Sequence, residues 1–190
     1  MISLLPASAR NTRPWKNGGG STQELFAEPP GSGTDDFSWR ISVATIDGIG
    51  PFSEFAGVDR SLCLLSDAPL QLLVDEVRFR LDTSQPVLRF SGEARVRAEA
   101  AAAPHTVLNV MSRRDCFAHT LHRFDGHDGQ HVALDAAAAH LLFVRSGACR
   151  LQGHPWSLQQ YDAALVADET QIVLQTAVPA ELILVTITLA

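Results

Sequence analysis

Long apolar runs and paired cysteines are both missing from this sequence of 190 residues. No apolar stretch approaches the ~20 residues that a membrane-spanning helix needs, and residues 1–10 lack the basic start and long apolar core of a signal peptide. Cys63, Cys116 and Cys149 are far apart and include no C-x-x-C pair. Because widely spaced cysteines in odd number favour reduced thiols over a disulfide framework, we expect a cytoplasmic protein that does not contact a membrane.

Positive charge is also scarce. Lysine and arginine total 15 residues against 21 aspartates and glutamates, which gives a formal net charge of −6 at pH 7. No basic stripe is present to follow a phosphate backbone, so we expect no nucleic-acid partner. Lys16 is the only lysine, and arginine suits the planar recognition of carboxylates. The charge pattern therefore agrees better with a small acidic ligand than with a nucleic acid.

Motifs of two enzyme classes are absent as well. Neither G-x-x-x-x-G-K-[ST] nor G-x-G-x-x-G occurs, which argues against a nucleotide loop. The G-x-S-x-G elbow of many serine hydrolases is missing too. Nucleophilic catalysis therefore finds little support in the sequence.

Short apolar runs separated by turn residues dominate the chain. Residues 77–81 alternate apolar and charged side chains, which is the period-two pattern of a half-buried strand. We expect strands at residues 39–46, 61–65, 70–74, 77–81, 86–90, 106–111, 117–121, 140–144, 148–151, 156–158, 163–167, 171–176 and 181–189. Two alanine-rich segments, 93–103 and 134–139, show no apolar stripe and are predicted to be loops or short helical turns. The spacing predicts an antiparallel all-β barrel or sandwich.

Four polar motifs stand out against this background. In residues 15–24, WKNGGGSTQE, three consecutive glycines lie between an indole, an amide and two hydroxyls. Bare backbone N–H groups beside such side chains favour close approach of a small polar ligand, whereas the alternative is a flexible turn between two strands. The other motifs are FSWRISVA at 37–44, GPFSEFAGVDR at 50–60 and LNVMSRR at 108–114.

Together and in this order, the four motifs resemble the HutD/Ves family of histidine-utilisation and stress-linked proteins. The resemblance implies an all-β fold of two packed cupin-like barrels, a bicupin in which each barrel is a double-stranded β-helix. Residues 1–118 would form a barrel with a ligand pocket, and residues 119–190 a structural barrel. It also implies a regulatory, ligand-sensing role in histidine degradation. The family pattern implies an acid where this chain has Val107, so its specificity or affinity is expected to differ.

The motifs supply polar side chains without acid–base machinery. On a strand, Arg40 and Ser42 share one face, opposite Trp39, Ile41 and Val43. Arginine pairs two-to-two with carboxylate oxygens, so a donor-rich pocket fits a small carboxylate, with Trp15 or Phe52 as an apolar wall. The expected ligand-binding residues are Trp15, Asn17, Gly18, Gly19, Thr22, Arg40, Ser42, Arg60, Asn109, Met111 and Arg113.

Each assignment has a plain structural alternative. Arg40 and Arg60 could form surface ion pairs with Glu54 and Asp59, since most arginines are solvated. Trp15 could instead belong to the core, as large aromatic residues mostly do.

We expect neither a metal nor another cofactor. The resemblance to cupins would place a metal in a G-x5-H-x-H strand pair, and this motif is absent. The alternative is a histidine cluster in residues 119–131, where His122, His127 and His131 could converge across a turn.

The leading hypothesis is a metal-independent regulatory protein that senses an anionic intermediate, such as N-formylglutamate or urocanate, and limits histidine utilisation. The alternative is a metal-free cupin enzyme, an isomerase or hydrolase acting on a small carboxylate, with Glu24, Tyr161 or His105 transferring the proton. A third hypothesis is an interaction module for a pathway enzyme or regulator. A homodimer is also compatible with the sequence.

Overall fold

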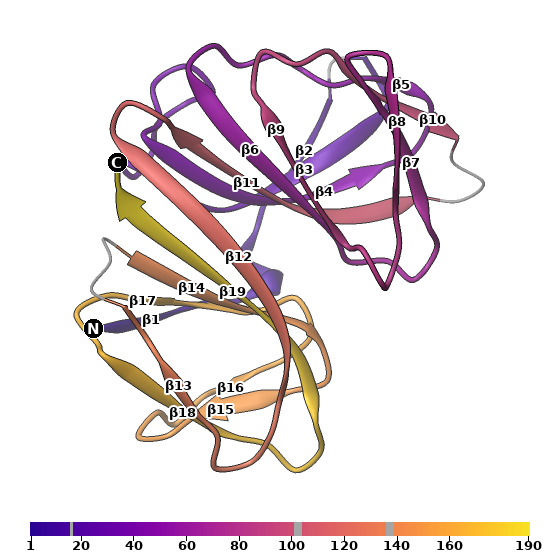
Figure 1. Cartoon of the computed structure of the whole chain (residues 1–190). Coiled ribbons are helices and arrows are strands. Elements are labelled where there is room, and N and C mark those ends of the chain that lie inside the picture. Colours follow the sequence, from indigo (N-terminus) through magenta and orange to yellow (C-terminus); the bar gives the residue numbers. More distant parts are fainter. Residues whose placement is uncertain (16, 101–103, 136–138) are drawn as a thin grey trace. The chain divides into compact units, whose positions relative to one another are not determined.

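The computed structural model describes residues 1–15, 17–100, 104–135 and 139–190 (Figure 1). Within them the chain forms nineteen strands and one 3-10 helix, η1 (Ala7–Ala9). The all-β fold predicted from the spacing of apolar runs is therefore confirmed. No helix among the described residues has the length and apolar character needed to cross a membrane.

The chain divides into two compact units. The N-terminal unit comprises residues 11–118 with Ala190, and the C-terminal unit comprises residues 1–10 with 119–189. This division differs from the predicted one in the placement of residues 1–10, which were expected in the first barrel. They join the C-terminal unit because β1 (Ile2–Leu5) pairs with β17 (Ala163–Val166), a partner that the sequence pattern does not reveal.

Two antiparallel sheets build the N-terminal unit, and Figure 1 shows them in indigo to pink. The six-stranded sheet has the order β2 (Thr12–Pro14), β3 (Gly20–Glu28), β4 (Trp39–Ile46), β11 (His105–Arg113), β6 (Val58–Leu64) and β9 (Val87–Ser91). The four-stranded sheet has the order β5 (Gly50–Pro51), β10 (Val96–Ala100), β7 (Leu70–Val74) and β8 (Val77–Leu81). Side chains alternate between the faces of each strand, so one face of each sheet contributes to the interior.

The apolar core of the N-terminal unit is formed by residues of both sheets. Leu62 and Leu64 of the larger sheet pack with Leu70 and Leu72 of the smaller one, and all four are at most 1% exposed. Burying each such side chain stabilises the fold by roughly 1.5–3 kcal/mol. The core occupies only part of the interior, and polar side chains line the remainder.

The C-terminal unit also consists of two sheets. The larger has the order β1, β17, β14 (Ala139–Ser146), β19 (Ala180–Leu189) and β12 (Phe117–Gly126). The smaller has the order β13 (His131–Ala133), β18 (Gln171–Gln175), β15 (Cys149–Leu151) and β16 (Ser157–Leu158). Its interior is filled by an apolar cluster that includes Leu142, Val144, Leu174 and Leu182, all 0% exposed.

One predicted loop is a strand. Within the alanine-rich segment 93–103, residues 96–100 form β10, which pairs with β7. Val96 and Ala98 of β10 are buried, so the helix propensity of alanine is overridden by packing between sheets. Residues 101–103, and residues 136–138 of the second alanine-rich segment, lie outside the described part of the chain.

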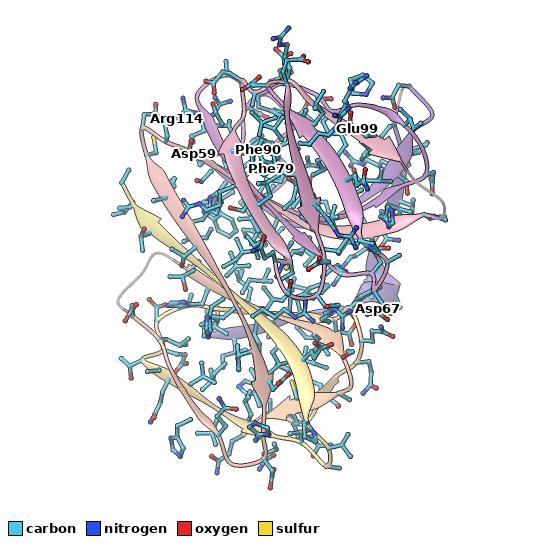
Figure 2. The ribbon with its side chains drawn as sticks, turned by 45° about the vertical axis from the view of Figure 1, so that its right-hand side comes forward. Asp59, Asp67, Phe79, Phe90, Glu99 and Arg114 are labelled. Atoms are coloured by element: carbon cyan, nitrogen blue, oxygen red, sulfur yellow. The ribbon has the colours of Figure 1, made fainter. Side chains whose placement is uncertain are left out.

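An ion-pair network ties the turns at one end of the N-terminal unit. Arg114 lies beside Asp59 (Figure 2), with its Nη2 3.0 Å from a carboxylate oxygen of Asp59 and 2.9 Å from Glu93. The hydrogen bond from Arg114 is the largest cause that lowers the pKa of Glu93, and Ser91 adds a second. Asp59 is thus the partner of Arg114 and not, as one sequence alternative had it, of Arg60.

Candidate ligand-binding site

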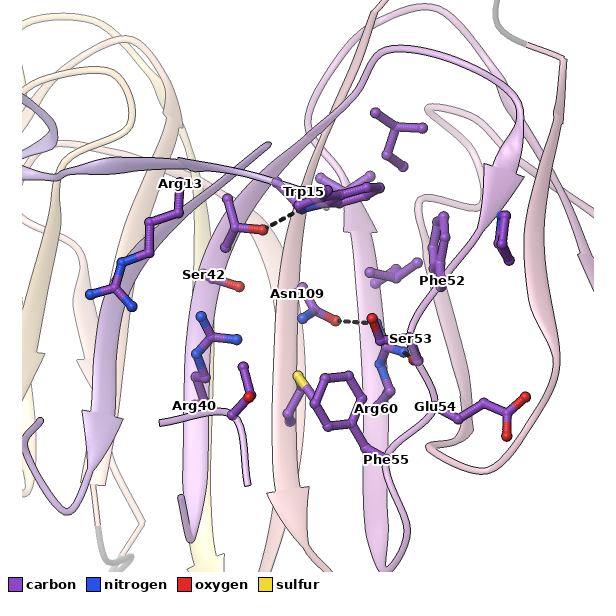
Figure 3. Close-up of a pocket in the computed structure, with 18 of the residues that line it drawn as sticks. Arg13, Trp15, Arg40, Ser42, Phe52, Ser53, Glu54, Phe55, Arg60 and Asn109 are labelled. Carbon is purple, nitrogen blue, oxygen red and sulfur yellow. Dashed lines mark hydrogen bonds between the residues drawn. The ribbon is translucent and has the colours of Figure 1, made fainter. Parts of the chain in front are cut away.

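A pocket of about 600 Å³ lies within the N-terminal unit. Strands β4, β11 and β6 form its floor, and Figure 3 shows Ser42, Asn109, Arg40 and Arg60 facing the same space. The lining residues are Arg13, Pro14, Trp15, Asn17, Thr22, Thr34, Asp35, Arg40, Ser42, Ala44, Ile46, Pro51, Phe52, Ser53, Glu54, Phe55, Arg60, Leu62, Val107, Asn109 and Met111.

Strand register brings the polar floor together. Met111 of β11 lies opposite Arg40 on one side and Arg60 on the other. One row further along, Asn109 lies between Ser42 and Leu62. Neighbouring strands are about 4.8 Å apart, so Arg40 and Arg60 originate roughly 10 Å from one another on the same face. This separation lets two guanidinium groups approach one small anion.

Arg60, on β6, is a buried cation of the floor, with only 6% of its surface exposed. Its Nη1 donates to the Ser53 carbonyl oxygen at 2.9 Å, and its Nη2 donates to Asn109 Oδ1 at 3.4 Å. Its Nε is buried and has no acceptor among the residues that the structure describes. No carboxylate within the described residues forms a salt bridge with Arg60.

Three aromatic rings surround this guanidinium. Its carbon lies 5.0 Å from the ring centre of Phe90, 5.3 Å from that of Phe55 and 6.0 Å from that of Phe52. Aromatic faces attract a cation but do not neutralise it. Burial and, to a smaller extent, the nearby charge of Arg40 together lower the pKa of Arg60 to about 10. Arg60 therefore remains charged at neutral pH in surroundings that favour an added anion.

Arg40 differs because it has an internal counter-ion. Its Nε donates to Glu24 Oε2 at 2.7 Å, across the pair formed by β3 and β4. Ser42, two residues after Arg40 on β4, is 1% exposed, and its hydroxyl has no hydrogen-bond partner within the described part of the chain. Buried polar groups normally have partners, so the unpartnered Ser42 Oγ and Arg60 Nε identify this part of the pocket as suited to a polar ligand.

Trp15 and Phe52 form an aromatic wall at the other end of the pocket. Their rings meet edge to face, with centres 5.9 Å apart. The indole N–H of Trp15 donates to Thr22 Oγ1 at 2.7 Å (Figure 3). Both rings also pack against the apolar core. Trp15 thus serves both core packing and the pocket lining, the two roles that the sequence left open.

The glycine-rich segment supports this wall through Asn17 and Gly20. Asn17 Nδ2 donates to the Pro51 carbonyl at 3.2 Å, and Asn17 Oδ1 accepts from the Gly19 N–H at 3.1 Å. Gly20 is closely enclosed, since a Cβ there would lie 2.1 Å from the Thr45 carbonyl oxygen and 3.1 Å from the Trp15 ring. Gly18 has a φ of +71°, which favours glycine. Lys16 lies outside the described residues.

Arg113 binds the rim rather than the interior. Its Nε donates to the Phe37 carbonyl at 3.0 Å and its Nη1 to the Ala56 carbonyl at 3.3 Å. Its Nη2 donates to the Asp35 carbonyl. Segments 34–35 and 53–55 both contribute to the pocket lining, so Arg113 positions the two sides of the rim.

Eight of the eleven sequence-predicted residues line the pocket: Trp15, Asn17, Thr22, Arg40, Ser42, Arg60, Asn109 and Met111. Gly18, Gly19 and Arg113 lie outside the lining. The sequence missed Arg13, which comes to the pocket because β2 pairs it with Thr22. It also missed Ser53, whose carbonyl oxygen holds Arg60 through a backbone contact that no side-chain pattern could reveal.

The lining does not offer the ligands that a transition metal prefers. It contains no histidine or cysteine, and its only carboxylates are those of Asp35 and Glu54. In the part of the chain that the structure describes, no three His, Cys, Asp or Glu side chains gather into a metal site. His131 instead contacts Gln171, and His122 stacks on Phe124.

None of the three residues considered for proton transfer lines the pocket. Glu24 is paired with Arg40, and Tyr161 belongs to the C-terminal unit, where it stacks on Phe143. His105 is 3% exposed, and desolvation by burial lowers its pKa.

Comparison with known proteins decides the family. A family model described as HutD matches residues 7–184, almost the whole chain. The chain belongs to the HutD family. It is similar to an uncharacterised 21.2 kDa protein in the hutC 3′ region of Pseudomonas putida, with 34% identity over 151 residues, 77% of this chain and 79% of the relative. It is also 40% identical to protein Ves of Citrobacter koseri over 103 residues, which cover 53% of this chain and 52% of Ves.

Solved structures agree with this membership. The structure of HutD from Pseudomonas fluorescens SBW25 (formate condition) matches with a TM-score of 0.85 and 27% identity, over 100% of both chains. A cupin 2 conserved barrel domain protein from Leptotrichia buccalis matches with a TM-score of 0.60 and 9% identity, over 88% of each chain. The second likeness concerns the fold alone. The predicted cupin-like fold and the resemblance to the HutD/Ves family are thus confirmed.

Proposed function

We propose that this HutD-family chain is a regulatory protein that binds a small anionic intermediate of histidine degradation, such as N-formylglutamate or urocanate, and thereby limits histidine utilisation. The family and the relative from the hutC region suggest involvement in histidine utilisation. Binding would require no metal, since arginine and hydroxyl groups meet the carboxylate. The effect on the pathway would pass through a pathway enzyme or regulator that distinguishes the liganded from the free protein.

The observation that supports binding most directly is Arg60. Removing a guanidinium from water is costly unless an opposite charge compensates it. Arg60 is buried, has no carboxylate partner among the described residues, and faces a pocket beside a second arginine. A ligand carboxylate would accept hydrogen bonds from the Nε–H of Arg60 and the hydroxyl of Ser42, two groups without a partner among the described residues.

The test is thermal unfolding of the purified protein with N-formylglutamate, urocanate and glutamate, each with and without EDTA. A ligand at a hundred times its Kd adds about 2.7 kcal/mol to the free energy of unfolding. For a chain of this size, that corresponds to a rise of roughly 5–10 °C in Tm. We expect a selective rise that EDTA does not change.

Two variants show whether the pocket is responsible. Arg60→Met removes the buried cation, and we expect it to abolish the ligand-induced rise. Arg89→Met removes an exposed arginine of β9 in the same unit and should leave the rise intact. If no pathway acid raises the Tm at millimolar concentration, or if Arg60→Met responds like the unaltered protein, the proposal is wrong.

A further inference from the structure

The pocket changes from polar to apolar along all three floor strands, one row earlier on β6 than on β4 and β11. On β4, Arg40 and Ser42 are followed on the same face by Ala44 and Ile46. On β6, Arg60 is followed by Leu62. The antiparallel strand β11 has the matching order in reverse, since Val107 lies opposite Ala44, and Asn109 lies opposite Ser42. The pocket therefore has one end suited to an anion and one suited to an apolar group.

The apolar end is long enough for a ring. From Ser42 to Ile46 is four residues, or about 13 Å along the strand at roughly 3.3 Å per residue. Trp15 and Phe52 also line the pocket, present aromatic surface, and pack against the core cluster that contains Ala44, Ile46 and Val107. Because the indole N–H of Trp15 is already bound to Thr22, the wall has no free N–H donor for a second charged group.

We infer that the preferred ligand is a monocarboxylate joined by a short, unsaturated linker to a flat ring. Its carboxylate lies between Arg60, Ser42 and Asn109, and its ring lies between Val107 and the wall of Trp15 and Phe52. This inference rests on the proposed function and narrows it, since it favours aryl- and heteroaryl-acrylates over dicarboxylates. A second carboxylate buried against Ala44, Ile46 and Val107 would lose its hydration, which is strongly unfavourable unless it reaches Arg13 at the rim.

One other cation borders the pocket. Arg13 is exposed at the rim, on the edge strand β2. A dicarboxylate that reached it would leave the surface of Ile46, Leu62 and Val107 uncovered by ligand. Burial of apolar surface is the larger gain available to a small ligand here, so we expect the aryl acids to bind more tightly.

The test is calorimetric titration with four acids: trans-urocanate and trans-cinnamate as flat monocarboxylates, and N-formylglutamate and glutarate as dicarboxylates. We expect both flat acids to bind about tenfold or more tightly than either dicarboxylate, a difference that corresponds to burial of one ring. Saturated imidazolepropionate should bind more weakly than urocanate, because its linker loses rotational freedom on binding.

Two variants locate the ring. Val107→Thr keeps the shape of the side chain but places a hydroxyl at the apolar end, and should weaken the flat acids about fivefold without weakening the dicarboxylates. Phe52→Leu removes the aromatic face and should act in the same direction. Val77→Thr, the same change at an exposed position of β8 outside the pocket, is the matched control and should change nothing.

The outcomes separate this inference from the function on which it rests. If none of the four acids binds, the proposed function fails, and the inference fails with it. If N-formylglutamate or glutarate binds as tightly as the flat acids, or if Val107→Thr leaves the affinity for urocanate unchanged, the inference is overturned while a carboxylate-binding role stands. If Arg13→Ala lowers the affinity for dicarboxylates alone, the second carboxylate of these ligands binds Arg13 at the rim and does not enter the apolar end.

Discussion

Among single residues, two buried arginines of this chain differ in how their charge is compensated. Arg145 of β14 donates to Glu181, which also accepts a hydrogen bond from Arg123 at 2.5 Å. Arg60 of β6 has backbone, amide and aromatic contacts but no carboxylate among the described residues. A charge compensated within the fold contributes to stability, whereas an uncompensated buried charge opposes it.

We therefore predict opposite effects on stability for the same substitution at these two positions. The lowered pKa of Arg60, about 10 against 12.5, reflects burial and the charge of Arg40, which together disfavour the charged form by about 3 kcal/mol. The two hydrogen bonds lost with it contribute about 1 kcal/mol each. Arg60→Met should thus leave the free energy of unfolding unchanged or raise it by about 1 kcal/mol, as measured by urea unfolding without ligand.

Arg145→Met provides the contrast, because it removes one of the charged partners of Glu181. It should lower the free energy of unfolding by about 3 kcal/mol. A loss of that size in Arg60→Met would instead show that Arg60 is required for folding, and would remove the main support for the ligand site.

At the scale of single elements, strand β3 and the glycine segment before it illustrate what the sequence does not reveal. Residues 20–28 carry few apolar side chains, so period-two counting missed a strand that pairs with β4 along its length. Its register shifts between Glu24 and Phe26. Glu24, just before this shift, lies opposite Ser42 and forms an ion pair with Arg40, for which one sequence alternative had offered Glu54.

Substitutions at Gly18 and Gly20 of this segment should differ in their effect on stability. Gly20→Ala places a Cβ against the backbone of Thr45, which cannot yield easily, and should cost about 3 kcal/mol or more. Gly18→Ala meets no atoms but has a positive φ, and should cost about 1 kcal/mol. Gly48→Ala, in open space without a positive φ, is the control and should be neutral.

Urea unfolding of the three variants measures this order. A cost for Gly18→Ala as large as that of Gly20→Ala would mean that the tight approach at Gly20 is relieved by movement of the strand.

The extent to which the site was predictable follows from the same elements. Alternation within a strand placed Arg40 and Ser42 on one face, and Asn109 and Met111 on another, because side chains alternate by covalent geometry. Which strands are neighbours, and in what register, depends on long-range packing, so no local pattern could join Arg13 to Thr22. Arg113 was in step with Asn109, yet the carbonyls of the rim bind it outside the pocket.

For the whole molecule, the two units share an all-β architecture but use their interiors differently. The N-terminal unit keeps polar residues on its inner face, while the interior of the C-terminal unit is filled by apolar side chains. The structural role predicted for the C-terminal barrel remains a prediction. Its first strand comes from residues 2–5, in which Ile2 and Leu4 pack against that apolar cluster.

Loss of the packing by Leu4 should lower the stability of the C-terminal unit only. Leu4→Ala removes part of a partly buried side chain and should destabilise the C-terminal unit by about 2 kcal/mol. Amide hydrogen exchange should then be faster in β17, the pairing partner of β1, while the affinity of the pocket for urocanate is unchanged.

Ser3→Ala alters the exposed neighbour on the same strand and should leave exchange unaffected. Equal acceleration in β4 and β11 after Leu4→Ala would show that the two units unfold together.

The position of Trp15 has a spectroscopic consequence. Of the three tryptophans, Trp15 alone lines the pocket, while Trp39 stacks on Phe26 and Trp156 belongs to the C-terminal unit. A conjugated acid seated against its indole would quench the intrinsic emission of Trp15 and leave that of the other two in place. The protein thus carries its own fluorophore for pocket occupancy, and Trp39→Phe together with Trp156→Phe would isolate that signal without any attached dye.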